Sequence, residues 1–440
     1  FDVRADVSRL KVNGDNLERL DVRASRAAGS DSLRLGLAIV TSGAPRAVAD
    51  GAYCFSTDRL DLPFKIDSLS TGFLNFYLDN CIDQWKGSTS GSLSLHGPLA
   101  DIALDANLKM NDDNFFRVKQ TDVTYHIDNN DSLTLSPSSM DFHDIRFTDR
   151  NGRHGIFSGF IKHWMFSHLD LGLDFLVDDM VLLQTDSEES PTYYGDIYGS
   201  GRMSITGPTS NVDILINAKT GKNSTFTVAP NAKSDLSNAD FIVFDSDEAK
   251  ASKLADILGT GTSATLKLHV TPDAKLSVVI DPKTGNQLTG TGAGDLTVEV
   301  GRTGALDMHG NYVIDAGTYN FSFSVFDKQF TIDNGSSIYW DGGPYDATVN
   351  IAATYLVKAS IYSLVSGTSY DNNADLKRRV PVKCKIFLTG RLTQPDIRFG
   401  IEIPSSQNFN QYAFDQYVNT QEEVSRQVFA LLTSGQFYAL

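Results

Sequence analysis

Apolar and polar residues alternate along most of this chain, with the period of two that is typical of β-strands. Over residues 101–110, every second side chain from Ile102 to Met110 is apolar, and Asp101, Asp105, Asn107 and Lys109 lie on the opposite face. The same period recurs in residues 266–270, 276–280, 319–325 and 397–403. Because each of these strands has one apolar face, the pattern predicts an all-β protein whose sheet buries one side.

One strand-turn-strand unit is repeated along the chain. It reads Gly91-Ser-Leu-Ser-Leu-His-Gly-Pro98 in one place and Gly201-Arg-Met-Ser-Ile-Thr-Gly-Pro208 in another, and a second alternating run follows each. Thr271-Pro-Asp273 and Asp281-Pro-Lys-Thr-Gly285 supply further turn residues. Loops this short cannot make the crossover that parallel strands need, so we expect antiparallel hairpins. Such hairpins must stack into an extended body to bury their apolar faces.

A long antiparallel sheet curled into a U-shaped apolar groove, a β-taco, fits this pattern best. A compact sandwich would need several cores joined by linkers, and no Pro/Ser/Gly-rich linker divides the 440 residues. An outer-membrane barrel would carry regularly spaced aromatic girdles, which these strands lack. A β-solenoid with parallel rungs, as in a surface adhesin or a carbohydrate-binding protein, is the further alternative. We expect a repetitive β-groove segment over residues 1–200, a second β-groove domain over 201–405 and a helical segment over 406–440.

Two segments have helical character. Near the C-terminus, Thr420 and Glu423 form a capping-box pattern, and Gly435 is a natural helix stop. The apolar residues that follow the cap at helical spacing are Val424, Val428 and Leu431. We expect this amphipathic helix to plug an open end of the groove or to face a partner. Residues 247–258 fit either a helix or a loop between strands.

The formal net charge of -16 argues against nucleic acid and against anionic lipid headgroups as partners, since both attract clustered Lys and Arg. No apolar run reaches the roughly 18 residues that a membrane-spanning helix requires. The chain opens at Phe1 rather than Met, so we expect a mature or excised fragment. The three cysteines, Cys54, Cys81 and Cys384, have no metal-ligand or redox spacing, and a disulfide between Cys54 and Cys81 stays open.

Catalytic and metal sites are not favoured by the motifs. Four histidines lie within a short stretch, but they form no His-Glu-x-x-His pattern and are expected in turns or solvent: His143, His154, His163 and His168. The glycine-rich run Gly290–Asp295 is followed by a strand rather than a helix, so we expect a flexible turn. No Gly-x-Ser-x-Gly elbow is present. The sequence therefore predicts neither an enzyme nor a bound metal or cofactor.

Residues 290–362 contain the most distinctive motifs of the chain. In order, these are Gly294-Asp-Leu-Thr-Val-Glu299, Leu306-Asp-Met-His-Gly310, Gly317-Thr-Tyr-Asn-Phe321, Phe330-Thr-Ile-Asp-Asn-Gly335, Gly343-Pro-Tyr-Asp-Ala347 and Ile351-Ala-Ala-Thr-Tyr355. This stretch resembles the C-terminal domain of the TamB family, the inner-membrane subunit of the translocation and assembly module, an AsmA-like family of the bridge-like lipid transfer class. A weaker resemblance extends over 390–427, whereas residues 1–200 share only the strand-turn repeat.

The resemblance implies a periplasmic β-groove that bridges the inner and outer membranes of a Gram-negative bacterium. It implies an anchor in the inner membrane, which this fragment lacks, and an Omp85-family outer-membrane barrel as partner, TamA-like or BamA-like. The implied function is the conduction of phospholipids, whose acyl chains the groove shelters. The alternative is a structural or chaperone-like factor for the assembly and secretion of outer-membrane proteins.

The side chains expected to line the lipid groove are the apolar residues of the alternating runs. They are Leu93, Leu95, Ile102, Leu104, Leu108, Met203, Ile205, Val212, Ile214, Leu266, Leu268, Leu296, Val298, Tyr319, Phe321, Phe323 and Val325. Alternation shows that one face is buried without showing what buries it, so an ordinary protein core is the competing interpretation for each.

Overall fold

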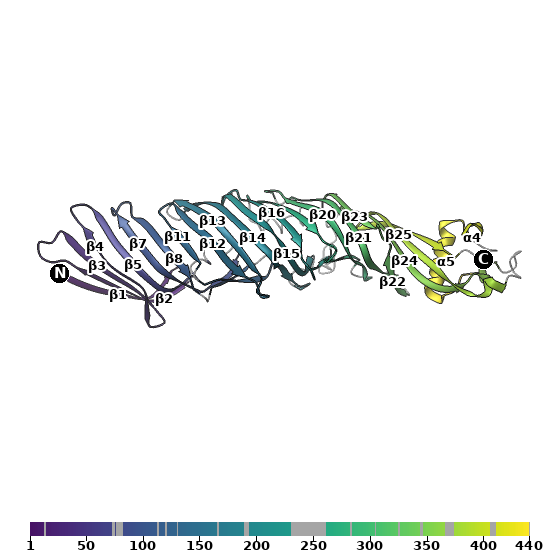
Figure 1. Cartoon of the computed structure of the whole chain (residues 1–440), viewed down its shortest axis with the longest axis horizontal. Coiled ribbons are helices and arrows are strands. Elements are labelled where there is room, and N and C mark those ends of the chain that lie inside the picture. The colour runs from purple at the N-terminus through teal and green to yellow at the C-terminus, as the bar shows by residue number, and fades with distance from the viewer. Residues whose placement is uncertain are drawn as a thin grey trace, which may run out of the picture.

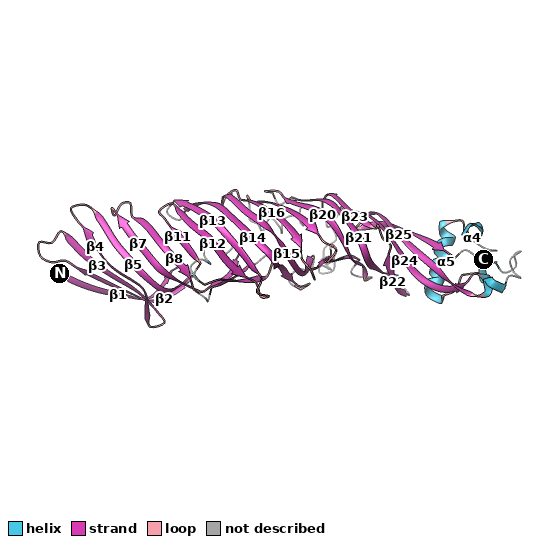
Figure 2. Cartoon of the chain, in the orientation of Figure 1, coloured by secondary structure: helices cyan, strands magenta, loops and turns pink. Residues whose placement is uncertain are grey.

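The chain forms one elongated β-sheet, with the N-terminus at one end and a small group of helices at the other (Figures 1 and 2). The computed structural model describes residues 1–12, 15–72, 75, 82–111, 114–118, 121–129, 131–164, 167–188, 193–229, 261–281, 284–303, 305–323, 326–343, 346–365, 374–404 and 411–439. Within these residues the sheet has 26 strands. The expected all-β architecture is confirmed.

In the part of the chain that the structure describes, the strands β1 to β24 follow one another up to Ser360. Those of the first part are β1 (Asp2–Val12), β2 (Asp15–Ser25), β3 (Ser32–Thr41), β4 (Ala44–Cys54), β5 (Arg59–Ser70), β6 (Ile82–Lys86), β7 (Ser88–Gly97), β8 (Ala103–Met110), β9 (Phe115–Val118), β10 (Val123–Ile127), β11 (Ser132–Leu135), β12 (Ser139–Thr148), β13 (His154–Trp164) and β14 (Ser167–Thr185).

The second part of the chain adds twelve strands and the helices. The strands are β15 (Tyr193–Pro208), β16 (Asp213–Thr220), β17 (Thr225–Val228), β18 (Ser263–Val270), β19 (Lys275–Asp281), β20 (Asn286–Val300), β21 (Leu306–Phe323), β22 (Phe326–Ile332), β23 (Ser337–Gly342), β24 (Thr348–Ser360), β25 (Arg379–Arg391) and β26 (Gln394–Glu402). The helices are α3 (Tyr362–Val365), the 3₁₀ turn η2 (Ala374–Lys377), α4 (Gln411–Tyr417) and α5 (Gln421–Ser434).

Most neighbouring strands pair antiparallel, as the short turns predict. Two pairs depart from this rule, because β16 runs parallel to β18 and β17 runs parallel to β19. The chain between β17 and β18 spans more than thirty residues, which is long enough for the crossover that a parallel pair requires. The helix or loop expected at 247–258 falls in this interval and lies outside the described residues.

Long strands pair with two short strands on one side, and this arrangement folds the sheet lengthwise. The strand β15 bonds to β16 and β17, β20 bonds to β18 and β19, and β21 bonds to β22 and β23. The interruption between the two short strands falls at the same level each time and marks a crease. The sheet therefore has two walls that meet along this crease, which is the expected U shape.

The segment Thr271-Pro-Asp273 lies on the crease and does not close a hairpin, contrary to the expectation from its turn chemistry. Before it, Ala264 pairs with Val300, and after it, Lys275 pairs with Thr291, so the chain continues in one direction along β20. Proline and aspartate here produce a corner inside a continuing strand. Turn residues fix a local change of direction, whereas only the partner strand decides whether the chain reverses.

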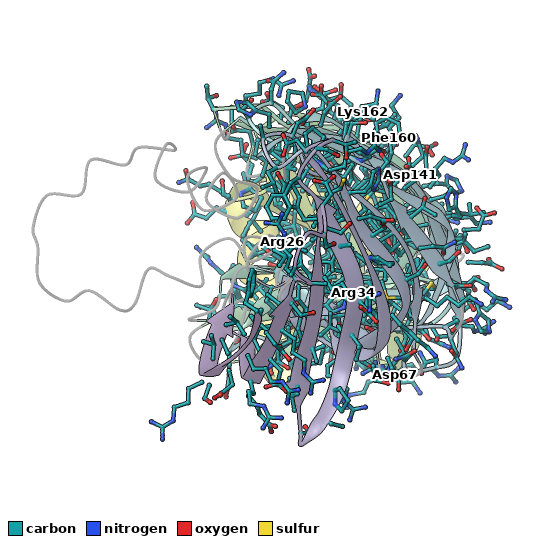
Figure 3. The ribbon with its side chains drawn as sticks, turned by 90° about the vertical axis from the view of Figure 1, so that its left-hand side faces the viewer. Arg26, Arg34, Asp67, Asp141, Phe160 and Lys162 are labelled. Atoms are coloured by element: carbon teal, nitrogen blue, oxygen red, sulfur yellow. The ribbon has the colours of Figure 1, made fainter. Side chains whose placement is uncertain are left out.

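Ring contacts at the C-terminal end show how strongly the sheet curls. The rings of Phe321 in β21 and Phe399 in β26 have centroids 6.0 Å apart. Four strand-to-strand steps separate these strands, which is roughly 19 Å in a flat sheet at about 4.8 Å a step. Seen from the N-terminal end, the side chains of Asp141 and Lys162 lie on the outer surface of the sheet, and the helices lie at the far end (Figure 3).

The buried residues gather on the concave side in three clusters of increasing size. The buried members of the first cluster are Ala49, Leu60 and Leu62. A second cluster extends from β6 to β14, and the largest includes β18 to β26 together with α4 and α5. The groove is therefore shallowly packed near the N-terminus and most densely packed at the C-terminal end.

Candidate functional site

The two faces of the sheet differ sharply in the middle of the molecule. In β16 the side chains of Ile214, Ile216 and Ala218 point to the concave side, and Asp213, Leu215, Asn217 and Lys219 alternate with them on the convex side. Neighbouring strands repeat this division. In β18, Leu266 and Leu268 point to the concave side, and Lys267 and His269 point to the convex side. Period-two alternation thus produces an apolar inner face and a polar outer face.

Cross-strand pairing aligns the inner side chains into continuous rows. Opposite residues of paired strands point to the same face of a sheet, so the register can be followed from strand to strand. One row crosses six strands, from Phe175 through Met203, Ile216, Leu266 and Val298 to Met308. Each of these side chains is half-buried, so part of its apolar surface reaches the solvent inside the groove. We call this row the open floor.

Most residues expected to line a groove lie on this concave face and are half-buried. They are Leu93, Leu95, Leu104, Leu108, Met203, Ile205, Ile214, Leu266, Leu268, Leu296 and Val298. The register brings them together, since Leu95 pairs with Leu104 and Ile205 pairs with Ile214. Whether lipid contacts them stays a prediction.

Two expected lining residues lie just outside the strands. Ile102 precedes the first residue of β8 and is 40% exposed, while Val212 precedes β16 and is buried. Both positions follow a Gly-Pro turn, where the alternating pattern begins before the pairing does. The side chain of Phe323 and the whole of Val325 lie outside the described residues.

Tyr319 and Phe321 belong to a packed core instead of an open surface. They are only 2% and 3% exposed, and Tyr319 pairs with Phe330, which is fully buried. Burial raises the pKa of Tyr319 to about 12, so its phenol stays neutral at physiological pH. The interpretation of an ordinary protein core, which the pattern left open, therefore holds for these two residues.

The C-terminal helices provide the covering layer at this end. Helix α5 contacts β22, β24 and β26, with Val428 and Leu431 fully buried and Val424 half-buried. The Thr420 hydroxyl accepts a hydrogen bond from the Glu423 amide at 3.2 Å, and Gly435 ends the helix in the left-handed conformation. The expected helix is thus confirmed, and its apolar face points into the groove. Helix α4 lies within the helical segment expected over 406–440, although no separate capping pattern was assigned to it.

A ladder of aromatic rings on the concave side was missed by the sequence analysis. It passes through Trp85, Phe116, Tyr125, Phe147, Phe157 and Phe175, with successive ring centroids 5.3 to 6.2 Å apart. Only Phe175 is half-buried, and it begins the open floor. The members come from six strands, so no local period connects them; aromatic residues at inward positions were the only available signal.

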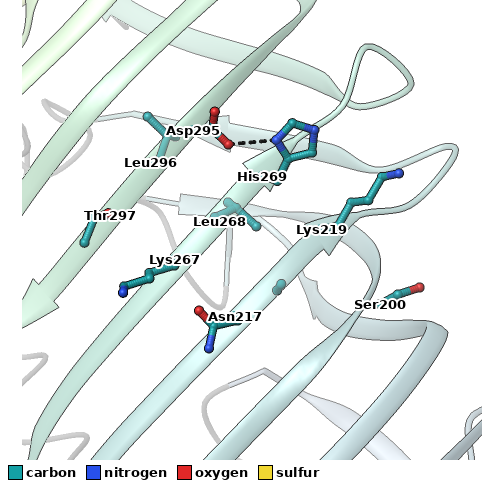
Figure 4. Close-up of a pocket in the computed structure, with 10 residues that line it drawn as sticks. Ser200, Asn217, Lys219, Lys267, Leu268, His269, Asp295, Leu296 and Thr297 are labelled. Atoms are coloured by element: carbon teal, nitrogen blue, oxygen red, sulfur yellow. Dashed lines mark hydrogen bonds and ion pairs between the residues drawn. The ribbon is translucent and has the colours of Figure 1, made fainter.

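The polar face carries a shallow cavity of about 470 Å³ around Lys267, His269 and Asp295 (Figure 4). The His269 Nδ1 atom lies 2.8 Å from an Asp295 carboxylate oxygen, but both side chains are more than half exposed. Among the described residues, no serine or cysteine is hydrogen-bonded to this histidine, so the pair lacks the nucleophile of a catalytic triad. The cavity is a hollow in a solvated surface.

The histidines singled out by the sequence are not brought together. His143, His154 and His168 are exposed as expected, but His163 is buried in β13, and burial lowers its pKa. Within the described ranges no three His, Cys, Asp or Glu residues form a group that could hold a metal ion. Cys54 is half-buried and Cys384 buried, both as free thiols, while Cys81 lies outside the described residues.

The glycine-rich run Gly290–Asp295 is not a flexible turn, contrary to expectation. It lies within β20, where Gly292 and Gly294 pair closely with β21. A Cβ atom on either glycine would lie 2.1 Å from a backbone oxygen of β21. Glycine is needed here because the two backbones approach each other at the crease.

Fold and site together define a β-groove protein, a lengthwise-folded sheet with one apolar inner face and one polar outer face. The family model of the TamB C-terminal domain matches residues 143–439, and the chain belongs to the TamB family. TamB proteins belong to the bacterial envelope, where they form part of a non-enzymatic translocation and assembly module that has an Omp85-type partner, TamA. None of the curated proteins compared with the chain matches it. None of the described helices is long and apolar enough to cross a membrane.

Proposed function

We propose that this chain conducts phospholipids through the periplasm, between the inner and outer membranes, by sheltering their acyl chains on the open floor. The observation that carries the proposal is the six-strand row of half-buried apolar side chains from Phe175 to Met308. An Omp85-family outer-membrane barrel would receive or supply the lipid. A structural or chaperone-like role in outer-membrane protein assembly is the competing function.

The energetic argument concerns the exposure of hydrocarbon to water. At about 0.8 kcal/mol per CH₂, an acyl chain of ~16 carbons costs on the order of 12 kcal/mol to hydrate. An apolar floor removes much of this cost while the headgroup stays in solvent at the open side. Because neighbouring strands are about 4.8 Å apart and carry similar aliphatic side chains, each step along the floor changes the contact energy little. Such a surface favours movement over tight binding at one point.

Two adjacent residues of β16 provide a matched test. Ile214 faces the groove and is half-buried, whereas Leu215 faces the outside and is 42% exposed. Ile214→Asp places a charge on the floor and should lower lipid transfer between vesicles at least tenfold, together with the phospholipid detected by native mass spectrometry. Leu215→Asp adds the same charge to the outer face and should leave both readouts unchanged.

Circular dichroism and binding to the Omp85-family partner keep the test specific. Both variants should retain the β-sheet spectrum and the partner complex. A scaffold that carries no lipid would be indifferent to Ile214→Asp. Full lipid transfer by that variant would therefore contradict the proposed function.

A further inference from the structure

The groove contains a segment of its own chain at the C-terminal end. Residues 411–439, which we call the C-terminal plug, comprise α4, α5 and the tail that follows them. The plug packs against the concave side of β22, β24 and β26, the same face that forms the open floor further along the sheet. The rings of Phe399 on β26 and Phe429 on α5 have centroids 5.3 Å apart. Apolar side chains of the plug thus occupy the position that hydrocarbon would occupy.

The plug holds itself together through contacts between its own parts. The Gln427 side chain is fully buried; its amide nitrogen donates to the Tyr438 carbonyl at 2.9 Å, and its oxygen accepts from the Tyr438 amide at 2.8 Å. This pair of bonds fixes the tail against α5. The rings of Phe414 and Phe437 add an apolar contact between α4 and the tail, with centroids 5.8 Å apart.

The attachment of the plug to the sheet is of a different kind. Among the described residues, hydrogen bonds from the plug to the sheet come from the Gln411 side chain, which donates to the Ile401 carbonyl and accepts from the Ile403 amide beside it. The Ser363 hydroxyl on α3 also donates a hydrogen bond to the Phe437 carbonyl of the plug at 3.4 Å. The rest of the attachment among the described residues is packing of apolar side chains. Such packing is non-directional, so acyl chains can replace it without loss of any backbone ladder. The plug can therefore leave as one body while the sheet stays intact.

We infer that the C-terminal plug is an autoinhibitory stopper, and that phospholipid passes the C-terminal end of the groove only when the plug moves away from β22, β24 and β26. This inference rests on the proposed function, because it concerns the route of the same cargo. Gln427 is the positioning residue of the device, since it joins the tail to α5. The stopper keeps the most apolar end of the groove from meeting water or foreign hydrocarbon when no lipid is delivered.

The experiment cross-links the plug to the sheet. It then measures two readouts separately: capture of lipid on the open floor and delivery of lipid to acceptor vesicles. All three native cysteines of the full chain are first replaced, and the substitutions Phe399→Cys and Phe429→Cys are introduced. A short cleavable bismaleimide then cross-links the two new thiols. A photoreactive amino acid at Met203 reports the capture of fluorescent phosphatidylethanolamine on the open floor. Delivery is the transfer of the same probe to acceptor vesicles of phosphatidylethanolamine and phosphatidylglycerol.

Cross-linking should lower delivery at least tenfold, leave capture at Met203 within twofold of the unlinked protein, and be reversed when the linker is cleaved. A matched control joins His269→Cys and Asp295→Cys on the outer face, where their strands are already paired, and should change neither readout. Unchanged delivery with the plug cross-linked would overturn the inference. Absence of capture in the unlinked protein would instead overturn the proposed function, and the inference with it.

A second variant tests the device in the opposite direction. Gln427→Ala removes both bonds to Tyr438 and should raise delivery severalfold, with Gln421→Ala at an exposed position of the same helix as control. Circular dichroism checks that the sheet is retained. Capture without delivery in both the unlinked protein and Gln427→Ala would show that release of the plug does not open this end, and would refute the stopper.

Discussion

Thr220 and Thr271 meet at the crease with their hydroxyl oxygens 3.1 Å apart, although 51 positions separate them in the sequence. Thr220 ends β16 and Thr271 follows β18, the parallel pair that the crossover creates. The Thr220 hydroxyl also accepts from the Thr271 amide at 2.9 Å, and the Thr271 hydroxyl is 3.2 Å from the Thr220 carbonyl. Side chains thus supply the hydrogen bonds that the backbone ladder loses where the sheet folds.

Thr220→Val should lower the free energy of unfolding by about 1–3 kcal/mol, because it leaves a buried amide of Thr271 without its acceptor. Urea denaturation followed by circular dichroism measures the change. Thr209→Val, at an exposed position after β15, is the control and should change little. Equal stability of the two variants would show that the crease does not depend on this contact.

His163 should make stability dependent on pH. Burial lowers its pKa below the usual value of about 6.5, so the unfolded chain takes up a proton at a higher pH than the folded chain does. The free energy of unfolding is therefore highest above about pH 6.5, where His163 is neutral in both the folded and the unfolded chain. It decreases as the pH falls towards the lower pKa that His163 has in the folded protein. His163→Gln should therefore show a smaller loss of stability between about pH 7 and pH 5 in urea titrations.

The exposed His154 is the control for this titration. His154→Gln removes an exposed imidazole from the same strand, so it shows the effect of a His-to-Gln substitution at a position that is not buried. A His163→Gln variant that loses as much stability on acidification as the parent would refute the assignment to this imidazole.

The two described thiols should differ in reactivity. Burial raises the pKa of Cys384 to about 12, whereas the Ser56 hydroxyl close to the sulfur of Cys54 lowers the pKa of that thiol. Because the thiolate is the nucleophile, iodoacetamide at about pH 8 should label Cys54 readily and Cys384 only after unfolding. Mass spectrometry of a Cys81→Ser protein measures both rates. Rapid labelling of Cys384 in the folded protein would contradict the packed C-terminal core.

Thr420→Ala should destabilise the C-terminal helix by about 1 kcal/mol, since the Glu423 amide loses its capping acceptor. Hydrogen exchange of α5 amides reports this loss directly. Ser425→Ala in the interior of the same helix should have the opposite sign, because alanine has the higher helix propensity. Faster exchange in the serine variant and unchanged exchange in the threonine variant would contradict the capping role.

Strands and their inner faces could be predicted because alternation is a local property. Ile205 and Ile214 were assigned to one surface from period alone, and they pair directly. The corner at Thr271 could not be predicted, since the same residues would serve a hairpin; only the pairing with β20 shows that the chain continues. The aromatic ladder was also invisible, because Trp85 and Phe175 are connected through four other strands.

The sequence by itself determined which side chains share a face, where the C-terminal helix begins and ends, and the family to which the distinctive motifs belong. These features depend on neighbouring residues and on the order of motifs. Only the tertiary structure decided which part of the apolar face stays open and which part is filled. Met203 and Tyr319 both point to the concave side, yet Met203 is half-buried and Tyr319 is 2% exposed. The difference arises because the sheet curls and α5 packs back onto its end, and burial by a distant segment leaves no trace in local periodicity.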